Sequence, residues 1–169
     1  MTDHLVLRHL ELGDGPAFAT WGLDRRFCEH AGWRLDRPLS GHEAHWHRLI
    51  TVPSPDHLRL AAVAAGELVG YVDFAGASAD ADPDRRELGY VVGPSTRWGQ
   101  GLGTAIARLA LAYGFGQLGL QEIWAEALDA NAASIRILQS IGMTEYARGA
   151  DDTFLGVPTF YRQFRIRGT

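Results

Sequence analysis

The chain has 169 residues and a formal net charge of −4 at pH 7. This length suits a single domain with a full hydrophobic core, and a mildly acidic chain without a basic stripe is not expected to bind nucleic acid. Its one cysteine, Cys28, excludes an intrachain disulfide and a thiolate metal cluster, and the absence of lysine excludes a phosphate-loop lysine or a Schiff base. The longest apolar runs are too short to cross a membrane, and the N-terminus lacks the layout of a secretory signal, so we expect a cytoplasmic protein.

The first half of the chain alternates between strand and helix patterns. Alternating apolar residues predict a strand over 4–10. The residue pattern of 13–33 predicts one or two helical segments. A helix is expected over 40–50, with Ser40 as N-cap and Glu43 completing a capping box. Two strands over 57–76 are expected to meet at a tight turn at 65–67.

The second half contains a strand–helix–strand crossover. A polar hairpin loop over 77–86 leads to a strand over 85–94 that Pro94 stops, and a helix is predicted over 102–118 from its apolar face. A strand over 121–128 follows, then a helix over 131–142 that Gly142 ends in a left-handed conformation, and strands over 144–149 and 159–167. The order predicts an α/β or α+β fold in which the two strands of the crossover at 87–128 are parallel.

Three glycines, Gly99, Gly101 and Gly103, lie where this strand meets this helix. Such turns often bind phosphate, because backbone N–H groups and a helix N-terminus attract anions. The ATPase phosphate loop needs a lysine, and the dinucleotide fingerprint needs a different glycine spacing in a unit near the start of the sheet. A structural turn without a ligand remains an alternative.

The hexapeptide Trp98–Gly103 resembles the acetyl-CoA pyrophosphate loop of the GNAT superfamily of N-acetyltransferases. Tryptophan replaces the usual first residue, and Arg97 lies one position earlier. The W-G-x-G form is similar to the branch related to ribosomal-protein N-terminal acetyltransferases. The segments ELGYVVGP and NAASIRILQSIGM resemble the fourth strand and the second cofactor motif.

The resemblance implies one N-acetyltransferase domain over 1–169, with a partly splayed mixed sheet of about seven strands and about four helices. Residues 1–55 would form the acceptor side, 56–148 the acetyl-CoA-binding core and 149–169 the last strand region. Val91 and Val92 would pair with the pantetheine arm as an added strand, and the amides of 99–104 would bind the pyrophosphate. The residues expected to contact acetyl-CoA are Val91, Val92, Trp98, Gly99, Gln100, Gly101, Leu102, Gly103, Thr104, Asn131 and Ser134.

Amine attack on a thioester needs a base, an oxyanion donor and a donor to the departing thiolate. Glu87 is expected to be the base, directly or through a water, with Asp73 as second candidate. Many relatives carry a tyrosine seven residues after the motif asparagine; here that residue is Leu138, so Ser134 is expected to serve the thiolate. An N–H at 91–92, where the family has a bulge, would bind the oxyanion. For Asn131, the chain's only asparagine, plain helix capping is the alternative to steadying the cofactor arm.

The histidine-rich segment HEAHWH at 42–47 lacks the spacing of a helical zinc-protease motif, so we expect exposed histidines on a helix face and no metal. The acceptor is expected to be the primary amine of a protein N-terminus or of a small molecule. A non-catalytic acyl-CoA-binding sensor with the same fold is one alternative, and a nicotinamide-dependent oxidoreductase is another. The sequence leaves the oligomeric state open, a homodimer included.

Overall fold

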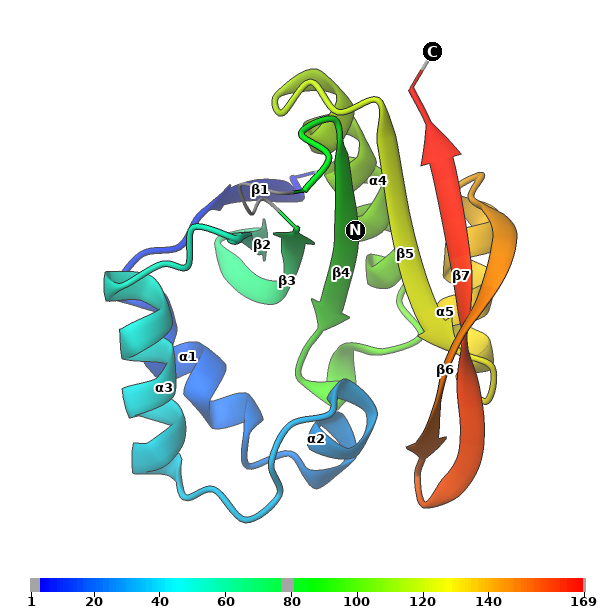
Figure 1. Ribbon diagram of the computed structural model, residues 1–169. Coiled ribbons are helices and arrows are strands. Elements are labelled where there is room, and N and C mark those ends of the chain that lie inside the picture. Colours follow the sequence, from blue (N-terminus) through cyan, green and yellow to red (C-terminus); the bar gives the residue numbers. More distant parts are fainter. Residues whose placement is uncertain (1–3, 77–80, 169) are drawn as a thin grey trace.

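The computed structural model describes residues 4–76 and 81–168, and these form one seven-stranded sheet in the order β1-β2-β3-β4-β5-β7-β6 (Figure 1). The strands are β1 (Val6–His9), β2 (His57–Ala64), β3 (Glu67–Ala75), β4 (Arg85–Val92), β5 (Glu122–Leu128), β6 (Thr144–Phe154) and β7 (Val157–Arg167). The helices are α1 (Asp14–Trp21), α2 (Arg25–Ala31), α3 (Leu39–Thr51), α4 (Leu102–Gly116) and α5 (Ala132–Ser140), with a short 3-10 helix at Ser95–Arg97. The mixed α/β fold and the seven strands are as expected, and the described residues hold five α-helices where about four were expected.

The helices α4 and α5 lie on one face of the sheet, and α1 and α3 lie on the other side, over the β2–β3 end (Figure 1). The larger hydrophobic core lies between the sheet and the α4–α5 layer. A second, aromatic core around Phe18, Trp46 and Tyr71 joins α1 and α3 to the opposite face. In β4, Leu88, Tyr90 and Val92 therefore face α4 and α5, and the alternate residues face away from them.

The centre of the sheet is open on one side. The parallel strands β4 and β5 pair only at Arg85↔Glu122, Arg86↔Ile123 and Glu87↔Trp124, and then diverge toward the bottom of the view (Figure 1). Every other pair of neighbouring strands in the described sheet is antiparallel. The expected parallel crossover and splay are thus confirmed, and 88–92 of β4 have a free edge beside β5.

Local signals placed most helix ends correctly. The Asp24 side chain accepts a hydrogen bond of 3.0 Å from Phe27 N and begins α2. Gly142, with φ +89°, follows α5 as expected. The capping box of Ser40 and Glu43 was a wrong prediction: α3 begins at Leu39 after Pro38 and has no side-chain cap. Pro38, in an extended conformation, is the N-cap two residues before Ser40, so Ser40 lies inside the first turn.

The strands β2 and β3 are joined by the expected tight turn. Ala65 and Gly66 form this turn, with φ of +50° and +81°. Residues 77–80 of the expected polar loop lie outside the described residues, and β4 begins at Arg85. Among the helices of the described ranges, none combines the length and apolar character needed to cross a membrane.

Candidate active site

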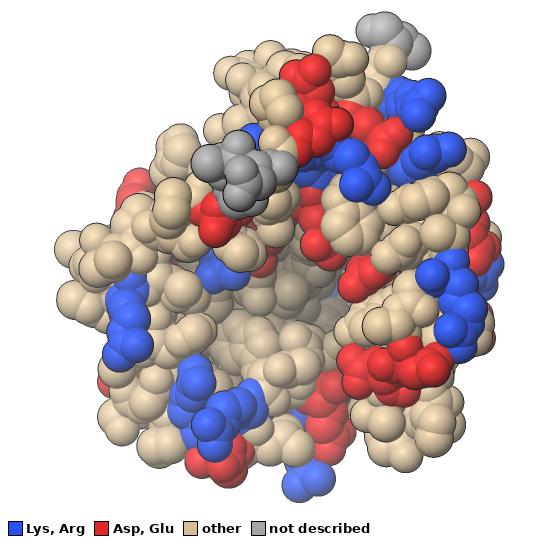
Figure 2. Space-filling model, viewed as in Figure 1, with Lys and Arg blue, Asp and Glu red and all other residues tan. Residues whose placement is uncertain are grey.

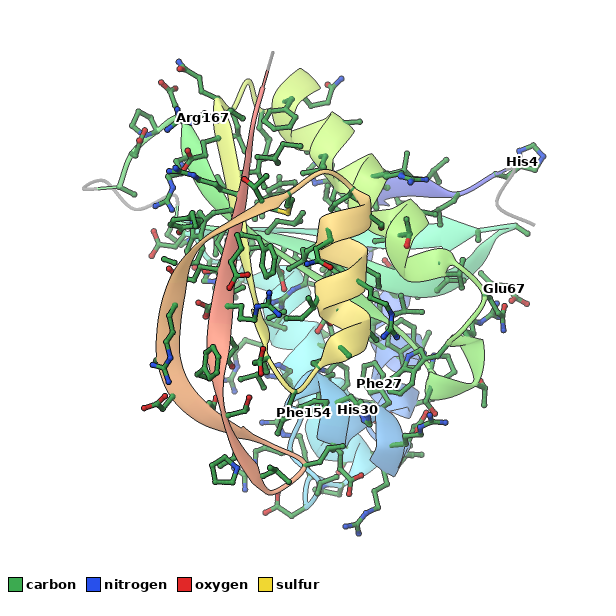
Figure 3. All side chains as sticks on the ribbon, turned by 90° about the vertical axis from the view of Figure 1, so that its right-hand side faces the viewer. His4, Phe27, His30, Glu67, Phe154 and Arg167 are labelled. Carbon is green, nitrogen blue, oxygen red and sulfur yellow. The ribbon has the colours of Figure 1, made fainter. Side chains whose placement is uncertain are left out.

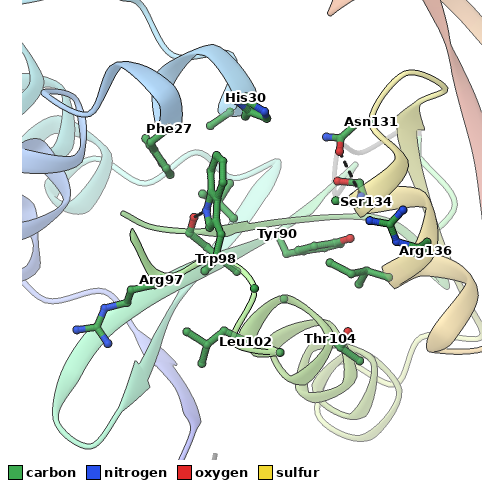
Figure 4. Close-up of a pocket in the computed structure, with 18 of the residues that line it drawn as sticks. Phe27, His30, Tyr90, Arg97, Trp98, Leu102, Thr104, Asn131, Ser134 and Arg136 are labelled. Carbon is green, nitrogen blue, oxygen red and sulfur yellow. Dashed lines mark hydrogen bonds between the residues drawn. The ribbon is translucent and has the colours of Figure 1, made fainter. Parts of the chain in front are cut away.

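A cavity of about 500 Å³ lies at the open end of the β4–β5 splay, between α2, α4 and α5 (Figure 4). Its volume is in the range of small-ligand sites. The lining residues are Phe27, His30, Ala31, Tyr90, Val91, Val92, Arg97, Trp98, Gly99, Gly101, Leu102, Gly103, Thr104, Asn131, Ala133, Ser134, Arg136, Ile137 and Ser140. The cavity therefore combines a helix N-terminus, a strand edge and the start of a second helix.

The three glycines of the turn have two different tasks. Gly99 and Gly101 have φ of +78° and +77°, and a Cβ on either would meet nothing within 4 Å. They permit the left-handed turn and leave the space beside it open. A Cβ on Gly103 would lie 2.7 Å from Ile137 Cδ1, so this glycine allows α4 to pack closely on α5.

The turn presents unpaired N–H groups at the start of α4. The first helical hydrogen bond runs from Ala105 N to Gly101 O at 3.1 Å, so the N–H groups of 102–104 point out of the helix end. Together with the helix dipole they make an anion-binding site. Arg136 of α5 adds a positive charge to the cavity lining, whereas the Arg97 guanidinium is held in an ion pair with Glu67.

The free edge of β4 offers backbone groups to the cavity. Gly93 N donates to Val69 O at 3.1 Å, and Val91 pairs with Tyr71 two residues along. Because antiparallel ladders alternate, the backbone groups of Val91 point to β3 and those of Tyr90 and Val92 point to the open edge. Trp98 Nε1 already donates to Val92 O at 2.8 Å.

Aromatic contacts join three segments at the cavity. The ring of His30 from α2 lies edge-on to Trp98 at 4.9 Å and to Phe154, at the tip of the β6–β7 hairpin, at 5.3 Å. Figure 3 shows Phe27, His30 and Phe154 at the same end of the molecule. The Arg26 guanidinium lies 5.1 Å from the centre of the Trp98 ring. Trp98 thus packs the glycine turn against α2.

Asp24 fixes the segment before the turn. Its carboxylate caps α2 and also accepts a hydrogen bond of 2.8 Å from Ser95 N. Burial alone would raise the pKa of Asp24, but the hydrogen bonds from Ser95, Phe27 and Arg26 outweigh it and lower that pKa. The carboxylate is therefore stabilised in its charged form and connects α2 to the loop that leads into α4.

Two groups face each other across the inner part of the cavity (Figure 4). On α5, Asn131 Oδ1 accepts a hydrogen bond of 3.3 Å from Ser134 N, so Asn131 caps the helix. From β4, the Tyr90 ring extends toward Ser134, and its hydroxyl is buried with no hydrogen-bond partner in the described part of the chain. Burial raises the pKa of Tyr90 far above its ordinary value, and the neighbouring Ser134 hydroxyl acts in the opposite direction.

The opposite face of the sheet carries acidic side chains beside a hollow. Figure 2 shows the hollow at the centre of this face, with both acidic and basic groups around it. Glu87 stands at the last β4–β5 pair, and burial, followed by the charge of Glu126, raises its pKa, with Arg85 acting against them. Glu126 accepts a hydrogen bond of 3.2 Å from Gln163. A carboxylate with a raised pKa is suited to accept a proton near neutral pH.

Similarity to known proteins decides the family. Residues 4–144 match the model of the acetyltransferase (GNAT) domain. The chain belongs to the GNAT acetyltransferase family. It is 36% identical over 86 residues to an FsC-acetyl coenzyme A-N(2)-transacetylase of Aspergillus fumigatus, an alignment that spans 48% of this chain and only 36% of that protein.

Solved structures with the same fold cover nearly the whole chain. A spermidine N-acetyltransferase of Vibrio cholerae, in complex with CoA and spermine, has a TM-score of 0.79 at 19% identity and covers 96% of this chain and 95% of its own. An aminoglycoside acetyltransferase in complex with coenzyme A has a TM-score of 0.74 at 20% identity, covering 95% and 94%. A GNAT acetyltransferase of Bacillus anthracis has 0.76 at 19%, covering 99% and 96%.

Within this GNAT fold, the residues expected to contact acetyl-CoA are brought together, with one exception. All of them line the cavity except Gln100, whose exposed side chain donates to Thr96 O at 3.3 Å. Sequence reasoning missed Tyr90, His30 and Arg136. Tyr90 directly precedes Val91, a strand residue that was expected to contact the cofactor, so the alternation of β4 was a usable signal that the Tyr90 side chain points to the opposite face of the sheet.

The expected catalytic residues lie in two places. Ser134 lines the cavity, and Glu87 lies at the closed end of the splay on the acidic face. Asp73 is a poor base, because Arg59 holds both its oxygens at 2.5 and 3.1 Å. The bulge expected at 91–92 does not occur: β4 pairs regularly with β3, and the register shifts of the described sheet lie in the β2–β3 and β6–β7 pairings.

The histidines of α3 differ from expectation in one respect. His45 and His47 are exposed, but His42 is buried against Trp33, with ring centres 5.6 Å apart, and its ring nitrogens have no partner among the described residues. A Cβ on Gly22 would overlap the His42 ring at 2.4 Å, so the imidazole fills space left by a glycine. Over 4–76 and 81–168, no group of three or more potential ligands is arranged to hold a metal ion.

Proposed function

We propose that this GNAT enzyme binds acetyl-CoA in the β4–β5 splay and transfers its acetyl group to the primary amine of a cationic acceptor. The observation that carries the proposal is the continuity of one cavity from the N-terminus of α4, along the free edge of β4, to the start of α5. These parts match the pyrophosphate, the amide-rich pantetheine arm and the thioester of acetyl-CoA. In this assignment the backbone groups of Tyr90 and the N–H of Val92, rather than the backbone of Val91, are offered to the arm, because Val92 O already accepts from Trp98.

The cofactor end is held by main-chain donors. The N–H groups of 102–104 and the α4 dipole bind the pyrophosphate, and Arg136 adds charge from α5. Asn131 steadies the start of α5 through its cap on Ser134 N, which leaves the Ser134 hydroxyl to donate toward the sulfur. These contacts direct the acyl group toward the closed end of the splay.

The acceptor end carries two neighbouring carboxylates. An ammonium ion that reaches the closed end of the splay meets Glu87 and Glu126, and the Glu87 carboxylate removes the proton, directly or through a water, so that a neutral amine attacks the carbonyl carbon. The spermine bound in one neighbouring structure and the aminoglycosides in the enzyme name of another are amines of this kind, which supports a small cationic acceptor. The motif likeness to ribosomal-protein N-terminal acetyltransferases adds a peptide N-terminus to the acceptors to be compared.

Thermal unfolding tests the cofactor. A rise of several degrees with acetyl-CoA, but not with NADH or zinc, is expected if the folded state alone binds acetyl-CoA. No rise at millimolar acetyl-CoA would refute the assignment of the cavity. A rise with NADH alone would favour a nicotinamide-dependent enzyme.

Release of the CoA thiol tests catalysis. The only cysteine, Cys28, is buried and its pKa is raised by burial, so a thiol reagent reports CoA with little background. Polyamines, aminoglycosides and N-terminal peptides are compared as acceptors, with buffer as control. Glu87→Gln is expected to lose rate while it keeps the acetyl-CoA thermal shift. A wild-type protein that binds acetyl-CoA but releases no thiol with any acceptor would instead indicate a sensor.

A further inference from the structure

Tyr90 is a buried polar group that the proposed mechanism has not used. It lies in β4, three residues after Glu87, and its side chain faces the α4–α5 layer with those of Leu88 and Val92. Its hydroxyl is buried and has no partner in the described residues. Buried hydroxyls are nearly always hydrogen-bonded, so an unpaired one inside a ligand cavity indicates a partner supplied by the ligand.

The hydroxyl is directed at the start of α5, where the proposed function places the thioester. Figure 4 shows the Tyr90 ring crossing the cavity from β4 toward Ser134 at the start of α5. Both residues line the cavity, and the Ser134 hydroxyl is near enough to act on the pKa of Tyr90, although no hydrogen bond joins the two side chains. The two hydroxyls thus approach the same point from the two sides of the splay.

One turn after Ser134, α5 carries an apolar side chain. Leu138 is 1% exposed and belongs to the core between the sheet and the α4–α5 layer. It has no donor to offer the cavity. Tyr90, on the facing strand β4, is therefore the residue that offers a second hydroxyl opposite Ser134.

We infer that the Tyr90 hydroxyl donates a hydrogen bond to the sulfur that leaves the acetyl group, alongside Ser134. This role rests on the proposed function, because it requires the thioester to lie in the splay. The amine nitrogen forms its bond to the carbonyl carbon, the carbon–sulfur bond breaks, and its electron pair stays on sulfur. Glu87 takes the proton lost by the amine and returns it to solvent, and the thiolate is protonated from solvent.

Tyr90 keeps its own proton throughout. Its raised pKa means that the phenol remains neutral and serves as a fixed donor, because a thiolate is a weaker base than this tyrosinate. A donor aimed at developing charge in a water-poor site stabilises the transition state more than the ground state.

The test is Tyr90→Phe, which removes only the hydroxyl. We expect kcat for acetyl transfer to fall about 100-fold, as for the loss of one preorganised donor. Binding of CoA is compared with that of desulfo-CoA, which lacks the sulfur: Tyr90→Phe is expected to weaken CoA about 5-fold and to leave desulfo-CoA unchanged. Tyr113→Phe, in the α4 tyrosine that stacks on Phe74, is the matched control and is expected to change neither.

The effect of Tyr90→Phe on folding is measured separately, as the melting temperature of the ligand-free protein. Removal of an unpaired buried hydroxyl is expected to leave the melting temperature of the ligand-free protein unchanged or raised, so a slower but equally stable variant identifies a catalytic contact. The inference is overturned if Tyr90→Phe retains wild-type kcat, or if it weakens CoA and desulfo-CoA equally, because the hydroxyl would then contact the arm rather than the sulfur. Wild-type protein that binds neither ligand would overturn the proposed function as well.

Discussion

The packing of α4 on α5 makes a prediction in which one substitution changes sign. Gly103 lies in the first turn of α4, and an added Cβ would be 2.7 Å from Ile137 Cδ1 but an ordinary 3.7 Å from Val92 Cγ2. The clash in Gly103→Ala therefore involves a single methyl group. Replacing Ile137 by valine removes that methyl and leaves Ile137 Cγ1, 3.9 Å away, as the nearest atom of this side chain.

The magnitudes follow from two opposing effects. Alanine is favoured over glycine in a helix by about 1 kcal/mol, and overpacking of a close contact costs about 1–3 kcal/mol. Gly103→Ala alone is thus expected to lower the free energy of unfolding by about 1 kcal/mol. Ile137→Val alone costs about 1 kcal/mol, and in that background Gly103→Ala is expected to raise the free energy of unfolding by up to about 1 kcal/mol.

Urea unfolding of the four proteins in this double-mutant cycle measures the coupling, expected to be about 2 kcal/mol. The melting temperature should move by about 2–4 °C for each kcal/mol in a chain of this size. If Gly103→Ala has the same effect in both backgrounds, the Ile137 side chain moves aside without a cost in free energy. The close approach of α4 and α5 would then not be the reason for glycine at this position.

Three further outcomes concern charge and turn geometry. Glu126→Gln removes a like charge that raises the pKa of Glu87, so the acid limb of the kcat/KM profile is expected to move to lower pH; an unmoved limb would separate Glu87 from that limb. Asp24→Ala is expected to destabilise by about 2 kcal/mol at pH 7 in urea unfolding, through loss of the α2 cap and of the bond to Ser95 N. Because the pKa of Asp24 is lowered on folding, this difference is present above its unfolded pKa and is expected to shrink as pH falls through the folded value; a constant difference down to pH 2 would contradict the assignment. Ala65→Asn, at φ +50° in the β2–β3 turn, is expected to raise the melting temperature, whereas the exposed Ala112→Asn in α4 is expected to lower it.

The crossover was predictable because its signals are local. Strand alternation over β4, the glycine turn and the apolar face of α4 lie within one continuous segment, and each specifies its own element. The structure places all of the residues expected to contact the cofactor except Gln100 around one cavity.

What the sequence could not reveal are contacts between distant segments. Glu126 raises the pKa of Glu87 only because parallel pairing brings β5 beside β4, and Asp24 reaches Ser95 only because α2 packs beside the glycine turn. His42 was expected to be exposed because it belongs to a segment rich in histidine and glutamate, but it is buried. Its spacing of four from the buried Trp46 was the available sign that it belongs to the inner face of α3.

The short pairing between β4 and β5, three residue pairs long, also fixes the length of the open part of the splay. The splay is closed at Glu87 and open at the glycine turn, and the five free residues between them span about 16 Å of extended strand. In the proposed binding mode, a donor has to be long enough for its anionic end to reach the α4 amides while its acyl end lies at the closed end of the splay. In that binding mode an acetyl thioester of a short thiol would not reach both ends, whereas a phosphopantetheine thioester would, so the backbone would select the donor by its length.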